Sequence, residues 1–135
     1  VIQIKTLGPG VGVSYGHTYV TQKETRIATV SAGYGDGYPR ALSSKGRVII
    51  NGQYAPIIDR VCMDIFMVDI THIEGVEIET PVILIGRDGD KVITAEEVGE
   101  LADTFNYEIV CSVSRRVPRI YLKDSVEVSE YTAFE

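Results

Sequence analysis

The sequence predicts a mainly β domain, barrel-like, with one short α-helix. Three observations support this fold class. Short apolar runs alternate with turn residues along most of the chain, which is typical of β-strands. Asn51 and Gly52 separate two of these runs, and this dipeptide favours a tight hairpin because both residues tolerate positive φ. A single stretch, which begins at Thr94, has the spacing of a helix.

The expected strands follow one another with turns between them. Residues 8–10, Gly-Pro-Gly, end the first strand, and residues 86–89 predict a turn late in the chain. Pro118 places its strand at a sheet edge or at a strand start, because proline cannot donate to a ladder. The strands are expected at residues 2–7, 26–32, 47–50, 54–58, 61–70, 82–85, 91–93, 117–122 and 126–128.

The helix is predicted from its first residue. Thr94 and Glu97 form a capping-box pattern, in which the threonine hydroxyl accepts from an N–H group and the glutamate reaches back. The helix is expected to stop near Asn106. Apolar residues recur after the cap at helical spacing, namely Val98, Leu101, Ala102 and Phe105.

Length and composition indicate one globular domain. The chain has 135 residues, of which 44% are hydrophobic and 24% charged. This length provides one core and is too short for two. We expect a single β domain over residues 1–128 and a polar tail over residues 129–135. The first residue is Val1 rather than Met, which is explained equally well by a cut from a longer chain, by processing or by the choice of the expressed segment.

Charge and hydropathy exclude several classes of partner. The net charge of −6 argues against a nucleic-acid binder, which would normally be basic, and against an anionic membrane surface. No apolar run approaches the roughly 18 residues of a membrane span, and no secretory signal opens the chain. Cys62 and Cys111 form no metal-type spacing and no disulfide framework, so we expect reduced cysteines and a cytoplasmic protein.

The most unusual run is glycine-rich and spans residues 33–40. Its three glycines alternate, whereas a dinucleotide-binding fingerprint needs a different spacing and a helix after it. A nucleotide loop is therefore rejected. Two interpretations stay open, a tight turn that leaves a strand and a functional loop, and Tyr34, Tyr38 and Arg40 in the run favour function.

Residues 60–64, Arg-Val-Cys-Met-Asp, lie in what the sequence predicts to be an apolar strand. Cysteine and methionine are usually core residues, but a buried carboxylate at Asp64 needs partners. It is either a structural acceptor or a site residue. His17 and His72 lack a second ligand at useful spacing, so no metal site is expected.

Tyr15 is a candidate for proton transfer. It follows a strand-like stretch and precedes Gly16, so its side chain can reach a cleft from a strand end. A free phenol has a pKa of about 10 and is a poor base at neutral pH without cationic or hydrogen-bonding neighbours. The residues alone leave Tyr15 one candidate among eight tyrosines.

Five blocks, taken in order, strongly resemble the C-terminal domain of alanine racemases. The resemblance runs from about residue 1 to residue 122. Each block is weak by itself, and their order makes the match specific. The blocks are Val13-Ser14-Tyr15-Gly16, residues 33–40, residues 60–64, Asn106-Tyr107-Glu108 and residues 116–121.

The resemblance implies a pyridoxal phosphate-dependent racemase that interconverts L- and D-alanine and serves D-alanine biosynthesis for the cell wall. In that family the cofactor forms a Schiff base with a lysine of an N-terminal barrel domain. None of the lysines in this chain matches that context, so the Schiff-base lysine is expected to lie outside it. Racemisation needs a base on each face of the substrate. The resemblance gives one face to the barrel lysine and the other to Tyr15.

The resemblance also assigns the remaining site residues, in an active site shared between two subunits of a homodimer. Met63 would contact the carboxylate of the amino-acid substrate through its N–H, with Cys62 and Asp64 beside it. Tyr107 would bind the cofactor phosphate. The residues of the substrate access corridor would be Tyr34, Arg40 and Arg60.

Three positions depart from the family pattern. Asp59 stands where glycine is usual, Ile65 where glutamine is frequent, and Phe105 where isoleucine is often found. These changes leave the chemistry alone but leave alanine and serine both open as substrates. Some relatives that racemise serine are fused to membrane segments, so the resemblance also leaves open that the chain is the cytoplasmic domain of a membrane-fused racemase. A different class of function also stays open, because an isolated domain without the lysine could be a binding or dimerisation module. We expect the isolated domain to be inactive.

Overall fold

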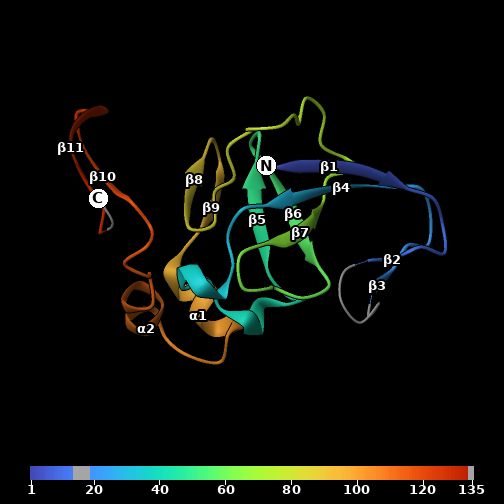
Figure 1. Cartoon of the computed structure of the whole chain (residues 1–135), viewed down its shortest axis with the longest axis horizontal. Coiled ribbons are helices and arrows are strands. Elements are labelled where there is room, and N and C mark those ends of the chain that lie inside the picture. The colour runs from blue at the N-terminus through green and yellow to red at the C-terminus, as the bar shows by residue number, and fades with distance from the viewer. Residues whose placement is uncertain (14–18, 134–135) are drawn as a thin grey trace.

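The computed structural model describes residues 1–13 and 19–133. A five-stranded antiparallel sheet forms the centre of the molecule, the helices lie at one end of it, and a C-terminal hairpin projects beyond them (Figure 1). The order of strands in the sheet is β1-β4-β7-β6-β5. Their bounds are β1 Gln3–Leu7, β4 Thr25–Val30, β5 Arg47–Ile50, β6 Gln53–Ile58 and β7 Phe66–Asp69.

The mainly β fold is confirmed, with two differences in detail. In the described residues the sheet stays open, because β1 and β5 end its strand order and do not pair with each other. Three two-stranded ribbons accompany the sheet. They pair β2 Gly12–Val13 with β3 Tyr19–Val20, β8 Gly86–Asp88 with β9 Lys91–Ile93, and β10 Arg119–Lys123 with β11 Val126–Tyr131.

The hairpin at Asn51-Gly52 is confirmed. Asn51 has φ 48° and Gly52 has φ 69°, so both central residues are in the left-handed region that a type I′ turn requires. The turn sets the register of β5 and β6, in which Val48 faces Ala55. Both of these residues are buried, which places the hairpin in the core.

One apolar core joins the sheet to the helices. Phe66 and Val68 of β7 and the three apolar residues of β5 are buried there. Helix α1, Ala95–Leu101, contributes Val98, and helix α2, Asn106–Cys111, contributes Ile109. The core therefore fixes both helices against the strands, and it also fixes the loops that leave the strands at the helical end.

Two expected strands are wrong in extent. The strand expected at residues 61–70 begins only at Phe66, because residues 59–65 form a bent loop between β6 and β7. Residues 82–85 form a single bridge, between Ile83 and Ile49. The strand follows at Gly86–Asp88, inside the expected turn, and the chain reverses at Gly89 and Asp90 instead.

The prediction of one helix is also wrong, because the helical part of the chain forms two separate helices. Helix α1 ends at Leu101, and Asp103 takes φ 59°, which a right-handed helix cannot continue through. Phe105 is extended and starts α2 at Asn106. Two short 3₁₀ helices also occur, η1 at Tyr34–Asp36 and η2 at Arg40–Leu42.

The C-terminal hairpin of β10 and β11 lies apart from the sheet (Figure 1). Strand β11 continues across position 128, where the sequence places the end of the domain. The domain boundary itself stays a prediction. Every residue of β11 is exposed. Among the described residues, no helix is long and apolar enough to cross a membrane.

Candidate active site

Two loops that are far apart in the sequence meet at the helical end of the sheet. The first leaves β4 and contains η1, and the second joins β6 to β7 and contains residues 62–64. The Tyr34 N–H donates to the carbonyl of Cys62 at 3.0 Å, and the Gly35 N–H donates to the carbonyl of Met63 at 2.8 Å. Two of the sequence blocks are thus joined main chain to main chain.

The glycines of the first loop allow this close approach. A Cβ atom at Gly33 would overlap the carbonyl oxygens of Cys62 and Met63. Gly37 has φ 100° and its Cβ would overlap the carbonyl of Ser112. The glycine run is therefore a tight turn whose glycines also permit close packing of the two loops, and the interpretation as a functional loop stays a prediction.

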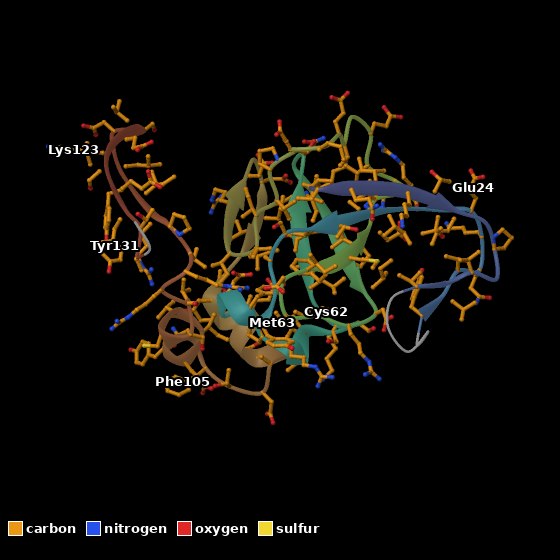
Figure 2. The ribbon with its side chains drawn as sticks, viewed as in Figure 1. Glu24, Cys62, Met63, Phe105, Lys123 and Tyr131 are labelled. Carbon is orange, nitrogen blue, oxygen red and sulfur yellow. The ribbon has the colours of Figure 1, made fainter. Side chains whose placement is uncertain are left out.

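The main-chain N–H of Met63 is available to a ligand. The Cys62 carbonyl belongs to the same peptide unit and is bound to the Tyr34 N–H, and in a trans peptide the N–H points the opposite way. Among the described residues, the Met63 N–H donates no hydrogen bond. The Cys62 N–H donates to the carbonyl of Ile65 at 2.9 Å and closes the loop. Met63 itself is 52% exposed and lies beside η1 (Figure 2).

Arg116 connects a third segment to both loops. Its Nη2 donates to Oδ1 of Asp64 at 2.8 Å and to the carbonyl of Met63 at 3.4 Å. Its Nε donates to Oδ1 of Asp36 at 2.8 Å. Hydrogen bonds to Asp36 and then to Asp64 raise the pKa of the Arg116 guanidinium above its ordinary value, so the side chain stays charged.

The segment that carries Arg116 is itself fixed. The Ser114 N–H donates to the carbonyl of Asp36 at 2.9 Å. The guanidinium of Arg119 donates to the carbonyls of Val113 and Val117, each at 3.2 Å, and so holds the turn between α2 and β10. Three blocks of the sequence therefore form one cluster, which we call the Arg116 cluster: Gly33, Tyr34, Gly35, Asp36, Cys62, Met63, Asp64, Ser114 and Arg116.

Asp64 differs from what the sequence predicts. Its side chain is 62% exposed and forms an ion pair with Arg116, so it is not a buried carboxylate in a strand. The bend of residues 63 and 64 turns it outward. Arg116 and Asp36 belong to the quoted blocks, but no feature of the sequence singles them out as site residues. An arginine in one block and carboxylates in two others are a signal that could have suggested the ion pairs.

The two tyrosines of the glycine run lie in different environments. Tyr34 is half exposed, as a residue of an access corridor would be. Tyr38 is buried, and its ring stacks on Phe66 with centroids 5.1 Å apart. Burial first, and then the nearby charge of Glu97, raises the pKa of Tyr38 well above its ordinary value. Tyr38 therefore keeps its proton and is a core residue.

A cavity of about 540 Å³ lies between the glycine run on one side and helix α2 with the segment that joins α1 to α2 on the other. Tyr34 lines it from one side, and Asp103, Thr104 and Glu108 line it from the other. Tyr107, in the first turn of α2, is 69% exposed and does not line it. The ring of Phe105 meets that of Tyr107 edge to face at 5.5 Å, and Phe105 is labelled beside α2 in Figure 2.

The remaining predicted residues are less closely linked. Arg40, in η2, and Arg60, in the loop before Cys62, are both exposed, and the described residues include no hydrogen-bond partner for either guanidinium. Tyr15 lies outside the described residues. No group of three or more histidine, cysteine or acidic residues in the described ranges could hold a metal ion.

Comparisons with known proteins give consistent matches. The family model "Alanine racemase, C-terminal domain" matches residues 1–121. An alanine racemase of Halothermothrix orenii is 51% identical over 121 residues, which are 90% of this chain and 32% of that protein. The chain thus spans about a third of the length of the relatives it matches.

Solved structures agree in fold. The alanine racemase of Bacillus anthracis with bound L-Ala-P has a TM-score of 0.88 and 42% identity, and the match covers 98% of this chain and 33% of that one. The alanine racemase of Bartonella henselae with covalently bound pyridoxal phosphate has a TM-score of 0.76 and 34% identity, over 84% of this chain and 31% of that one.

Proposed function

Because the chain belongs to the alanine racemase C-terminal domain family, we propose that it supplies one side of the active site of a pyridoxal phosphate-dependent alanine racemase. The observation that carries this proposal is the meeting of three family blocks in the Arg116 cluster, where a main-chain N–H is left for a ligand. The rest of the enzyme, about two thirds of the length of the relatives, would supply the barrel and its lysine.

In this proposal the cluster binds the carboxylate of the amino acid. The Met63 N–H points away from the main chain of Tyr34, and a substrate carboxylate can accept its hydrogen bond. Cys62 and Asp64 flank it on the same tight loop. Binding at the carboxylate orients Cα, so that its proton faces a base on either side. Tyr34, Arg40 and Arg60 would line the path by which the amino acid arrives.

One residue of this chain, Tyr107, fits a role in binding the phosphate of the cofactor. Tyr107 is exposed, and its hydroxyl makes no hydrogen bond to the described residues, so it can donate to a phosphate. When bound, pyridoxal phosphate withdraws electrons from the substrate and stabilises the carbanion at Cα. The cluster contains no lysine, so the covalent attachment would come from the barrel domain.

Tyr15 would hold and move the proton on one face of Cα. A phenol needs cationic or hydrogen-bonding neighbours for this role at neutral pH, and these would come from the barrel. Because a single base returns its proton to the face from which it came, inversion requires a second base on the other face. The active site would thus be shared, with the barrel of the partner subunit facing this domain in a homodimer.

Alanine is the substrate that the relatives favour, since the most similar of those compared are named alanine racemases and not serine racemases. We place the enzyme in the cytoplasm, on the observation that Cys62 and Cys111 are both free. The β domain would extend over residues 1–128, with residues 129–135 as its tail.

The test is a Tyr15→Phe variant of the full-length protein. Removal of the hydroxyl should abolish interconversion of L- and D-alanine, while the absorbance of the bound cofactor stays close to that of the unmodified protein. Turnover of alanine and of serine is measured in both directions by chiral chromatography, with Tyr121→Phe as a control on an exposed tyrosine of β10. Near-normal rates in the Tyr15→Phe variant would contradict the assignment.

A further inference from the structure

We propose that Arg116 is a positioning residue for substrate binding, which holds the Met63–Asp64 loop so that the Met63 N–H faces the amino-acid carboxylate. The inference rests on the proposed function, because it assigns a role at the same site. Arg116 belongs to neither loop, and its contacts reach residues 52 and 80 positions away.

The carbonyl of Met63 accepts hydrogen bonds from two groups. Gly35 N–H donates to this oxygen at 2.8 Å and Arg116 Nη2 at 3.4 Å. The same Nη2 donates to Oδ1 of Asp64, the next residue, at 2.8 Å. Arg116 therefore contacts this loop at two points, the carbonyl of Met63 and the side chain of Asp64. Without Arg116, only the Gly35 hydrogen bond among these three would remain.

Arg116 is itself oriented by Asp36. Its Nε donates to Oδ1 of Asp36, and Oδ2 of the same carboxylate accepts from the Gly33 N–H at 2.8 Å. The planar guanidinium thus bridges two carboxylates with a fixed direction. A lysine could supply the charge but not this pair of directed donors.

The charge of Arg116 also offsets negative charge at the loop. Asp36 and Asp64 place two negative charges beside the loop, and an amino-acid carboxylate would bring a third. Like charges repel, so the arrival of that carboxylate requires a nearby positive charge. Arg116 forms ion pairs with both aspartates at 2.8 Å and reduces this repulsion.

Gly35 offers an independent way to disturb the same contact. A Cβ atom there would lie 2.6 Å from Nη2 of Arg116 and 3.0 Å from the carbonyl of Met63. Gly35→Ala should therefore displace the guanidinium without removing its charge.

The experiment measures kinetics in the full-length protein. In Arg116→Ala, KM for alanine and the inhibition constant of propionate, a carboxylate without an amino group, should both rise roughly tenfold, which corresponds to about 1.4 kcal/mol. The value of kcat should change by less than about threefold, since the bases are untouched. For Arg116→Lys, both constants should lie between those of the unmodified protein and those of Arg116→Ala, because lysine keeps the charge and loses the pair of directed donors.

Arg115→Ala is the matched control. Arg115 is adjacent, exposed and without a hydrogen bond from its guanidinium to the described residues, so its removal should leave both constants within about twofold. A fall in kcat with KM and the propionate constant unchanged would overturn the inference. So would an Arg116→Ala variant that behaves like Arg115→Ala.

Hydrogen exchange provides a readout that does not depend on turnover. By mass spectrometry of the full-length protein, amide exchange at residues 62–65 should be faster in both Arg116→Ala and Gly35→Ala, with exchange in β6 unchanged as the control for folding. Unchanged exchange at residues 62–65 in a folded variant would overturn the inference. Failure of the unmodified protein to racemise alanine would instead defeat the proposed function, and exchange would still decide the role of Arg116.

Discussion

Asp59 shows how one backbone angle explains a departure from the family pattern. It directly follows the last residue of β6, is fully buried and has φ 60°. Such angles are favourable for glycine, the residue usual at this position by resemblance, while aspartate and asparagine tolerate them better than other residues. The substitution in this chain therefore keeps the turn that leads into the Met63 loop.

We predict the order of two variants at this position. Asp59→Ala and Asp59→Gly both lose the carboxylate, but only alanine keeps a Cβ atom in the left-handed region, which costs about 1–2 kcal/mol. Glycine gives back part of this through its more flexible unfolded chain. The glycine variant should be more stable by roughly 0.5–1 kcal/mol, measured by urea unfolding.

The neighbouring Arg60 supplies the control for that pair. Its φ is not positive, and its side chain is exposed. Only the flexibility of the unfolded chain then distinguishes alanine from glycine, so Arg60→Ala should be the more stable of its two variants. The same order at both positions would show that strain at Asp59 is not the cause.

At the scale of single residues, the sequence indicates the motifs but not their contacts. Met63 and Tyr34 were identified by their blocks, and the structure brings those blocks together. The ion pair of Arg116 with Asp36 spans 80 residues, and no local periodicity carries information about such a contact. The exposure of Asp64 does not follow from the sequence for a related reason, since a bend within an apolar run does not change its hydrophobic pattern.

At the scale of elements, helix α1 is held at its start and on one side. Thr94 Oγ1 accepts from the Glu97 N–H at 3.1 Å, as the sequence predicts. The carboxylate of Glu97 does not reach back to Thr94. It pairs instead with the guanidinium of Arg47 in β5, at 2.8 and 3.2 Å, and so ties the helix to the sheet.

The cap leads to a second prediction of stability. Thr94→Ala removes the acceptor for one orphan N–H and should destabilise the protein by about 1 kcal/mol in urea unfolding. Thr94→Ser keeps the hydroxyl and should lose only a small part of this. Equal losses in the two variants would show that the methyl group, and not the cap, is responsible.

The sequence pattern predicts neither the separate helix α2 nor the early end of α1, and each has its own physical reason. Helix α2 is six residues long, which is too short to produce a clear helical period, and α1 stops because Asp103 adopts a left-handed angle. Such an angle depends on what surrounds the residue. By contrast, the Asn51-Gly52 turn is set by its own two residues, and the sequence alone was sufficient to predict it.

At the scale of the whole molecule, we predict that the 135-residue chain alone is catalytically silent. It has one side of the proposed site and no lysine in the Arg116 cluster. The purified chain mixed with pyridoxal phosphate should show no Schiff-base absorbance and no interconversion of alanine. Detectable turnover would refute the view that the second base and the cofactor lysine lie elsewhere.

The Arg116 cluster has a consequence for the order in which the sheet folds and the ligand loop forms. The five-stranded sheet is complete by Asp69, whereas the cluster needs Arg116, which is made 47 residues later (116 − 69). Contacts of such long sequence separation form late, because loop closure must precede them. A nascent chain that stalls before Ser114 should hold a folded sheet with an unfinished ligand loop. Ligand affinity would then report that the segment with Arg116 has been made and has docked, while the five-stranded sheet would already be present.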